Sequence, residues 1–200
     1  MLPILLAAAA QLSAPPPAAK DLRTIFRADD YPATAMQRGE QGDVVPEVLV
    51  NPSGHVETCT IASSSGYPDL DSTTCAIIRE RTKFPSPTGP NGEPVYLLNR
   101  VPIGWGLGGP LPFAVNPDME LSINQPPAGA QLPISVFIKF LRNTDGSVTN
   151  CHATTAASPD LVGIACRVTN ESNRRVIRNA AKQPVSVLDS ATVRFVLDKR

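Results

Sequence analysis

The sequence lacks an excess of charge of either sign, because 18 Lys and Arg residues balance 18 Asp and Glu residues. No block rich in Lys or Arg is present, so there is no run of cations of the kind that follows a phosphate backbone. Long apolar runs are missing as well. The longest, residues 2–10, falls far short of the roughly 20 residues that a membrane-spanning helix needs. We therefore expect neither a nucleic-acid partner nor a membrane span in this chain.

Signatures of an enzyme are equally scarce. The motif G-x-S-x-G is absent, and the one serine cluster, residues 63–65, has no His and acid pair at a recognisable nucleophile motif. Asp69 and Asp71 are more simply explained as acids at a helix start than as paired catalytic carboxylates. The glycine-rich stretch at residues 104–109 lacks the following helix that a nucleotide-binding loop requires. The sequence therefore predicts a protein that is not an enzyme and needs no cofactor or metal.

What the sequence does contain is a duplication. The run VNPSGHVETCTIASSSGYPDLDSTTC (residues 50–75) is matched by RNTDGSVTNCHATTAASPDLVGIAC (residues 142–166). The offset of 92 residues that relates Gly54 to Gly146 falls to 91 at Pro68 and to 90 at Pro94. Because the blocks keep their order with only two small deletions, the pattern predicts two similar units. Halves of about ninety residues are each large enough for a modest core.

All four cysteines lie within the duplicated runs. Four cysteines allow three connectivities, and the repeat favours Cys59 with Cys75 and Cys151 with Cys166. Each bridge would stabilise its unit by about 3 kcal/mol in the chain-entropy account. Zinc is a competing interpretation, disfavoured because no C-x-x-C pair exists and because the two histidines do not occupy matching places. Buried free thiols are the alternative in a reducing compartment.

The opening residues resemble an export signal. Residues 1–14 are predicted to be a signal peptide, with an apolar stretch followed by small residues and cleavage near Ala10 or Ala14. No Lys or Arg precedes the stretch, which a start codon further upstream would explain; the alternative is an apolar tail. Residues 15–28 are predicted to be a Pro/Ala linker. We expect the mature protein in the periplasm, where disulfides persist.

Each copy shows the same order of predicted elements. Strands at residues 44–50 and 56–61 flank a turn at Gly54, and their counterparts lie at residues 134–140 and 148–154. Alternation places Glu47 on the solvent side of its strand. Helices begin at Pro68 and near Pro159, and third strands follow over residues 94–107 and 184–197. The prediction is an α+β fold of two tandem domains, each a small antiparallel sheet of about three strands with helices on one face.

The first copy, residues 29–107, resembles the C-terminal domain of TonB-family energy transducers of Gram-negative bacteria. The resemblance rests on YPATA (31–35), EQGDVVPEVLVNPSGHV (40–56), SSGYPDLD (64–71), RTKFPSP (81–87), GEPV (92–95) and VPIGW (101–105). Residues 108–132 are predicted to form a connector. Residues 133–200 keep the NTDG turn, the SPDL helix start and the last strand but lack the other motifs, which predicts a degenerate repeat of the same domain.

The resemblance implies a periplasmic protein-binding module whose partner is the TonB box, a short extended peptide of outer-membrane transport receptors. Such a peptide adds a strand to a sheet edge, so that backbone hydrogen bonds provide most of the affinity. The expected edge is the third strand of the first copy: Val95, Tyr96, Leu97, Leu98, Asn99, Arg100 and Val101. The alternative is a structural or assembly module that forms a homodimer through its edge strands. No membrane anchor or long Pro-rich spacer is recognisable, so we do not expect this chain alone to transduce energy.

Overall fold

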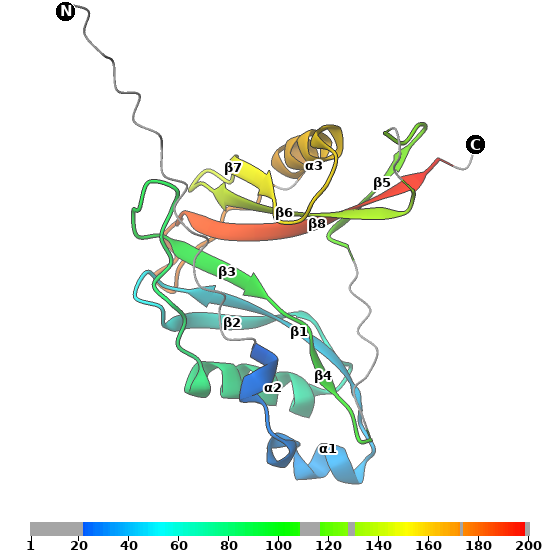
Figure 1. The fold of residues 1–200 in the computed structure, drawn as a ribbon. Helices are drawn as coiled ribbons and strands as arrows, with labels where there is room; N and C mark the ends of the chain where they lie inside the picture. The colour runs from blue at the N-terminus through cyan, green and yellow to red at the C-terminus, as the bar shows by residue number, and fades with distance from the viewer. Residues whose placement is uncertain (1–21, 109–116, 128–130, 173, 199–200) are drawn as a thin grey trace, which may run out of the picture.

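The computed structural model describes residues 22–108, 117–127, 131–172 and 174–198 (Figure 1). The predicted signal peptide lies outside the described residues. In chain order the elements are η1 (Leu22–Ile25), η2 (Ala28–Asp30), α1 (Ala33–Gln37), β1 (Gly42–Val50), β2 (Val56–Ser63), α2 (Pro68–Arg81), β3 (Tyr96–Arg100), β4 (Ile103–Trp105), β5 (Met119–Ile123), β6 (Ile134–Arg142), β7 (Val148–Ala153), α3 (Pro159–Ser172) and β8 (Val187–Leu197).

Each copy folds as a hairpin, a helix and a returning strand. In the first copy β1 lies between β2 and the pair β3–β4, all antiparallel, and α2 packs on β1 and β2. In the second copy β6 lies between β7 and β8, and α3 packs on β6 and β7. Proline begins both long helices, where its missing N–H is not needed. The mixed α+β fold is therefore the one that the sequence pattern predicts.

We predict two separate three-stranded sheets, but in the structure the two sheets are joined into one. The strand order is β2-β1-β3-β8-β6-β7, with β3 and β8 running parallel at the centre. This seam pairs Tyr96 with Val187 and Leu97 with Leu188. The prediction was wrong because a sequence pattern identifies strands and their faces but does not say which edges meet. Backbone groups left unpaired at the edge of each copy find partners in the other.

The helices of the two copies cover opposite faces of this sheet, and Figure 1 shows α2 on one side and α3 on the other. Side chains alternate between faces along a strand. Val44 and Val48 of β1 pack beneath α2, whereas Leu49 faces away from it and contacts a cluster that includes Val187 of β8. Further along the same face of β8, Phe195 packs beneath α3. Because the equivalent strands β3 and β8 pair in parallel, the second copy is turned over relative to the first. The face of the sheet that α3 covers is therefore opposite to the face that α2 covers.

Two predicted boundaries are corrected by the structure. Leu22, assigned to the Pro/Ala linker, is 1 % exposed and belongs to the core under α2. The connector contributes β5, which pairs in parallel with the end of β8. In addition, the long third strand of the first copy is interrupted at Pro102, which has no N–H to donate, so that β3 and β4 are separate strands.

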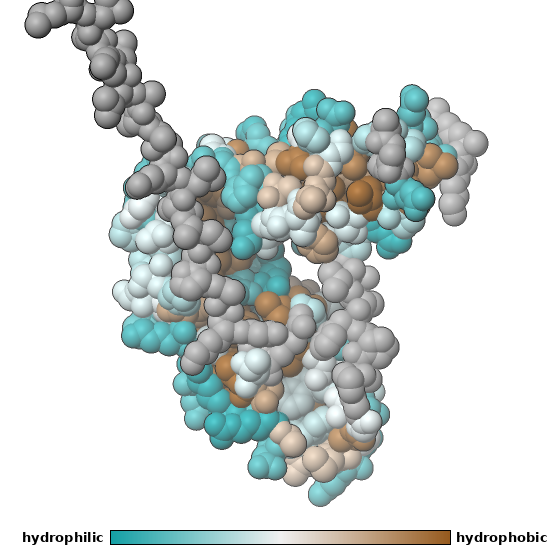
Figure 2. Space-filling view, viewed as in Figure 1, coloured by the Kyte–Doolittle hydropathy of each residue, from teal (hydrophilic) through white to brown (hydrophobic). Residues whose placement is uncertain are grey.

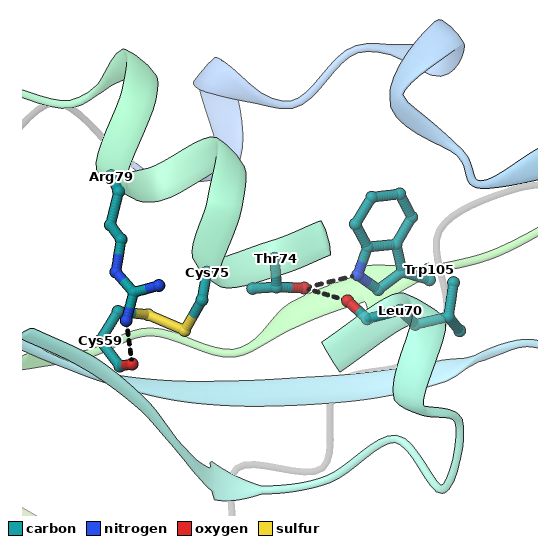
Figure 3. The surroundings of a disulfide bond; sticks show 6 residues. All are labelled: Cys59, Leu70, Thr74, Cys75, Arg79 and Trp105. Carbon is teal, nitrogen blue, oxygen red and sulfur yellow. Dashed lines mark hydrogen bonds between the residues drawn. A yellow bond between two sulfur atoms is a disulfide. The ribbon is translucent and has the colours of Figure 1, made fainter. Parts of the chain in front are cut away.

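The disulfides join Cys59 to Cys75 and Cys151 to Cys166, the connectivity that the repeat favours. In each copy the bridge ties the second strand of the hairpin to the helix above it, with Cα atoms 5.7 and 5.8 Å apart. Around the first bridge, Trp105 of β4 donates its indole N–H to Thr74 of α2, at 2.9 Å (Figure 3). The helix is thereby attached to both β2 and β4.

We predict that removing either bridge destabilises the protein to a similar extent. The double substitution Cys59→Ser with Cys75→Ser should lower the free energy of unfolding by about 3 kcal/mol, because the unfolded chain regains the freedom of the closed loop. Cys151→Ser with Cys166→Ser is the matched variant and should give a similar loss. Urea denaturation followed by Trp105 fluorescence measures the effect, and an unchanged midpoint would contradict it.

The turn at Gly54 gives a second prediction. Gly54 has φ +81°, and a Cβ at this position would lie 2.1 Å from the carbonyl oxygen of Phe84, which belongs to backbone. Gly54→Ala should therefore destabilise the protein by more than the roughly 1 kcal/mol that left-handed backbone alone costs an L residue. Gly39→Ala is the control, since Gly39 has φ +66° but nothing within 4 Å of its Cβ position. Equal losses in thermal melts of the two variants would refute the role of the close approach.

Candidate functional site

The predicted peptide-binding strand lies at the centre of the merged sheet. Residues 96–100 form β3, one side of which pairs with β1. The other side, which we call the outer edge of β3, pairs with β8 at Tyr96 and Leu97. The expectation of a free edge over Val95–Val101 is therefore wrong for the first half of the strand. The prediction fails there because β8 of the second copy pairs with the backbone groups that we expected to be free.

Beyond Leu97 the two central strands separate. β8 continues toward β5, whereas β3 leads into β4, which pairs with β1 through Ile103 and Val44. Among the described residues, no strand pairs with the outer edge at Asn99 and Arg100 or with the corresponding side of β4. The space-filling view shows a hollow between the two halves of the molecule on this side (Figure 2). The outer edge therefore keeps unpaired backbone in its second half.

A chain of ion pairs crosses the seam where the strands separate. Arg100 donates to Glu47 of β1 at 2.9 Å and to Asp189 of β8 at 3.2 Å. Asp189 also accepts two hydrogen bonds from Arg142 of β6, each 3.1 Å long. Glu47 accepts two more from Arg175, which follows α3. The chain Arg175–Glu47–Arg100–Asp189–Arg142, which we call the seam network, links both copies.

Most of the seam network is buried, including Glu47, which we had placed on the solvent side. Glu47 is 9 % exposed, Asp189 4 % and Arg142 2 %. Burial on its own would raise the pKa of Glu47, but hydrogen bonds from Arg175 and Arg100 outweigh it and lower the pKa below its ordinary value of 4.5. Glu47 does face away from α2, as the alternation of side chains along β1 predicts. The error arose because the outward face of the first copy is covered by the segment after α3.

The outermost strands of the sheet are protected at their free sides. At one end, the Arg79 guanidinium of α2 donates to the carbonyl of Cys59 in β2, at 2.8 Å (Figure 3). At the other end, Asn170 of α3 accepts from the N–H of Val148 in β7, at 2.9 Å. Side chains that occupy edge groups discourage the addition of a further strand. These contacts favour the central edge over the two ends as a place for a partner.

Beside β4 lies a small cavity with aromatic walls. Phe26 and Tyr31 meet the ring of Trp105 edge-on, with centroids 5.6 and 5.4 Å away. A cavity of about 190 Å³ is lined by these rings together with Arg27, Ala28, Ile103, Gly104 and Gly106. Trp105 itself is only 5 % exposed and belongs to the core beneath α2. Nothing in the sequence placed Phe26 here, because that residue fell within the predicted linker.

The carboxylates considered for catalysis take structural roles. Asp69 accepts hydrogen bonds from Thr34 and Arg38, and Asp71 accepts from Ser64 and Ser65. Both residues lie in the first turn of α2, as predicted. Within the described ranges, no group of three or more His, Cys, Asp or Glu side chains could hold a metal ion. In the same part of the chain no helix combines the length and apolar character needed to span a membrane.

Comparison with known proteins identifies the first copy. Residues 27–107 match the family described as Gram-negative bacterial TonB protein C-terminal. Those residues are a TonB C-terminal domain. A 41-residue stretch is 54 % identical to "Protein TonB" of Neisseria gonorrhoeae, covering 20 % of this chain and 14 % of that protein. The same stretch is 54 % identical to the "Protein TonB" of Neisseria meningitidis serogroup C, covering 15 % of its length.

This chain thus spans about a seventh of the length of the curated TonB proteins that it matches. A solved structure is also similar, the NMR solution structure of the Helicobacter pylori TonB-CTD. It is 25 % identical, covers 45 % of this chain and 80 % of that chain, and superposes with a TM-score of 0.37. The family match ends at residue 107, so the second copy is connected to the TonB C-terminal domain through the internal repeat.

We predict that the seam network stabilises the fold in a pH-dependent way. Glu47→Gln should lower the free energy of unfolding by roughly 2 kcal/mol at neutral pH, because a charged acceptor of Arg100 and Arg175 is lost. A carboxylate with a depressed pKa contributes its stability above its unfolded pKa and loses it as the pH falls through the folded value. The difference between variant and wild type should therefore vanish in acid.

The matched control is Asp69→Asn, which removes an exposed carboxylate paired with Arg38. Exposed ion pairs contribute little, so this variant should remain close to wild type. Urea denaturation at a series of pH values makes the comparison. A Glu47→Gln loss that persists unchanged in acid would show that the ion pairs do not produce it.

Proposed function

We propose that this chain is a periplasmic TonB-like binding module that pairs the edge of β3–β4 with an extended peptide of an outer-membrane transport receptor. The TonB C-terminal domain at residues 27–107 supports the class of partner. The observation that carries the proposal is the parallel pairing of β8 with β3 at Tyr96 and Leu97. The first half of this edge already pairs with β8 of the same chain. Its second half has backbone N–H and C=O groups that remain available to a strand from another molecule.

The geometry restricts how such a peptide binds. Because β8 occupies the edge at Tyr96 and Leu97, a peptide pairs with the strand from Asn99 onward unless it displaces β8. The seam network opposes displacement, since separating the strands would expose Asp189 and Arg142, which are buried and paired. Peptide addition therefore centres on the end of β3 and on β4, a narrower region than Val95–Val101.

A second candidate is an assembly module without energy transduction, which associates through its edge strands. Pairing of β3 with β8 favours it, because the two copies already use their edges to bind each other. In this account the strand edges pair with each other, either within one chain or between two chains, and no receptor peptide is involved. Measuring the molar mass of the purified chain by light scattering distinguishes the two candidates. An assembly module gives the mass of a dimer or larger oligomer, whereas a receptor-binding module functions as a monomer.

Titration of a synthetic TonB-box peptide into the ¹⁵N-labelled, disulfide-bonded chain tests the leading proposal. We expect amide shifts at Arg100 and residues 103–106, where an added strand would bond to free backbone. Amides of Tyr96 and Leu97 should move little while β8 stays in place. A peptide of the same composition in scrambled order is the control. Absence of shifts along residues 95–106 at saturating peptide would remove receptor binding by this edge.

A further inference from the structure

A second cavity lies on the face of the first copy's sheet that is opposite to α2. Its volume is about 360 Å³, within the range of roughly 300–1,000 Å³ that is usual for sites that hold small molecules. Strands β1, β2 and β3 form its floor, and residues 175–178 of the segment after α3 form its wall. Because floor and wall come from different copies, this cavity, which we call the seam cavity, exists only while the two copies are joined.

One part of the seam cavity is apolar. Leu49 and Leu98 pair across β1 and β3, and Ile177 packs with both of them. These three side chains are buried, whereas Val176, which lies beside Ile177 in the wall, is 36 % exposed. Removing apolar surface from contact with water is favourable. The valine and the leucines at this cavity therefore favour a ligand that has a hydrocarbon part.

Two hydroxyl groups belong to the floor of the seam cavity. Thr58 pairs with Leu49 and Thr60 with Glu47 in the β1–β2 ladder, so both threonines lie on the same face of the sheet as the cavity. Neither hydroxyl forms a hydrogen bond with another residue in the part of the chain that the structure describes. Thr58 is partly exposed and Thr60 is exposed. Both hydroxyl groups can therefore donate to a ligand.

The wall of the seam cavity contributes two guanidinium groups. That of Arg175 donates two hydrogen bonds to Glu47, the one acidic residue that lines the cavity. That of Arg178 donates to the carbonyl of Lys182 at 2.9 Å, which holds the side chain in place, and it pairs with no carboxylate of the described residues. Two cations against one anion leave the cavity with one uncompensated positive charge, on Arg178.

The internal repeat shows that the fold of this wall does not require the two arginines. The segment after α2 forms the same hairpin, in which Thr88 takes the place of Arg178 and Pro85 that of Arg175. Arg175 has a structural partner in Glu47, whereas Arg178 has a partner only in a backbone carbonyl. Arg178 is therefore the cation that remains available to a ligand.

We infer that the seam cavity binds a small organic carboxylate with a short hydrocarbon tail. Arg178 and the hydroxyls of Thr58 and Thr60 donate to the carboxylate, and the tail contacts the apolar part of the cavity. A hydrogen bond from a guanidinium to a carboxylate is stronger than one between neutral groups. One uncompensated cation suits a singly charged carboxylate better than a phosphate, which carries nearly two charges.

The position of the seam cavity determines what such a ligand does. The site lies on a face of the sheet, so it binds its ligand whether or not β3–β4 pairs with a receptor peptide. A ligand that binds only the folded form with both copies joined stabilises that form by mass action. The carboxylate therefore holds the segment after α3 against the first copy and raises the melting temperature of the chain.

Titration of sodium hexanoate into the ¹⁵N-labelled, disulfide-bonded full chain tests the inference. We expect saturable amide shifts at Thr58, Thr60, Val176 and Ile177. Acetate keeps the charge but lacks the tail, and hexan-1-ol keeps the tail but lacks the charge. Each should bind at least about tenfold more weakly than hexanoate. Absence of saturable shifts with hexanoate, or equal binding of hexanoate and either of the other compounds, would overturn the inference.

A matched pair of chain variants locates the carboxylate. Arg178→Gln removes the uncompensated cation and should lower the affinity for hexanoate about tenfold. Arg167→Gln makes the same change in net charge at an exposed position of α3 that does not line the cavity, and should leave the affinity unchanged. Equal losses in the two variants would mean attraction by net charge alone and would refute the site.

A third variant tests the hydroxyls. Thr60→Val keeps the shape of an exposed side chain but removes its donor, and should weaken hexanoate binding several-fold. Urea denaturation without hexanoate verifies that each variant is folded. Affinities for hexanoate that are unchanged in both Thr60→Val and Arg178→Gln would show that the carboxylate binds elsewhere, which would also overturn the inference.

Discussion

The parallel contact between β3 and β8 is the constraint on which the arrangement of this molecule depends. Only two residue pairs form the ladder, so backbone hydrogen bonding alone is a small contribution. The seam network adds charged hydrogen bonds across the contact, from Glu47 through Arg100 to Asp189. Buried ion pairs often contribute little net stability, because desolvation offsets their attraction. Their main effect here is to fix the register, since only one alignment places Arg100 between the two carboxylates.

From that register the other features of the sheet follow. A parallel contact between equivalent edges inverts one copy relative to the other, which places α2 and α3 on opposite faces (Figure 1). The segment after α3 is carried onto the exposed face of the first copy, where Ile177 joins Leu49 and Leu98. The central strands separate after Leu97, so each copy keeps an outer edge along the end of its last strand. The second copy fills its edge with β5.

Sequence reasoning recovered what is determined locally. Turn glycines, helix-initiating prolines and the cysteine spacing repeat in both copies, and each acts on residues close in sequence. Glu47 was misjudged because its partners lie 53 and 128 residues away. The free edge over Val95–Val101 was misjudged for the same reason, since β8 arrives from the end of the chain. β5 was overlooked because its five residues stand in a proline-rich stretch that reads as a connector.

The two copies have diverged in ways that match different roles. Glu47 and Arg100 of the first correspond to Lys139 and Ser190 of the second, so the seam network could not form symmetrically. Asp189 and Arg142 supply it from the other side instead. At the outer edges, Gly104 stands where the second copy has Arg194, which lies near Glu120 of β5. The second copy thus carries a side chain that favours its pairing with β5. The first copy has a glycine at the equivalent position, beside the aromatic cavity. This difference agrees with the proposed function, in which the first copy binds a partner while the second copy has its own edge filled by β5.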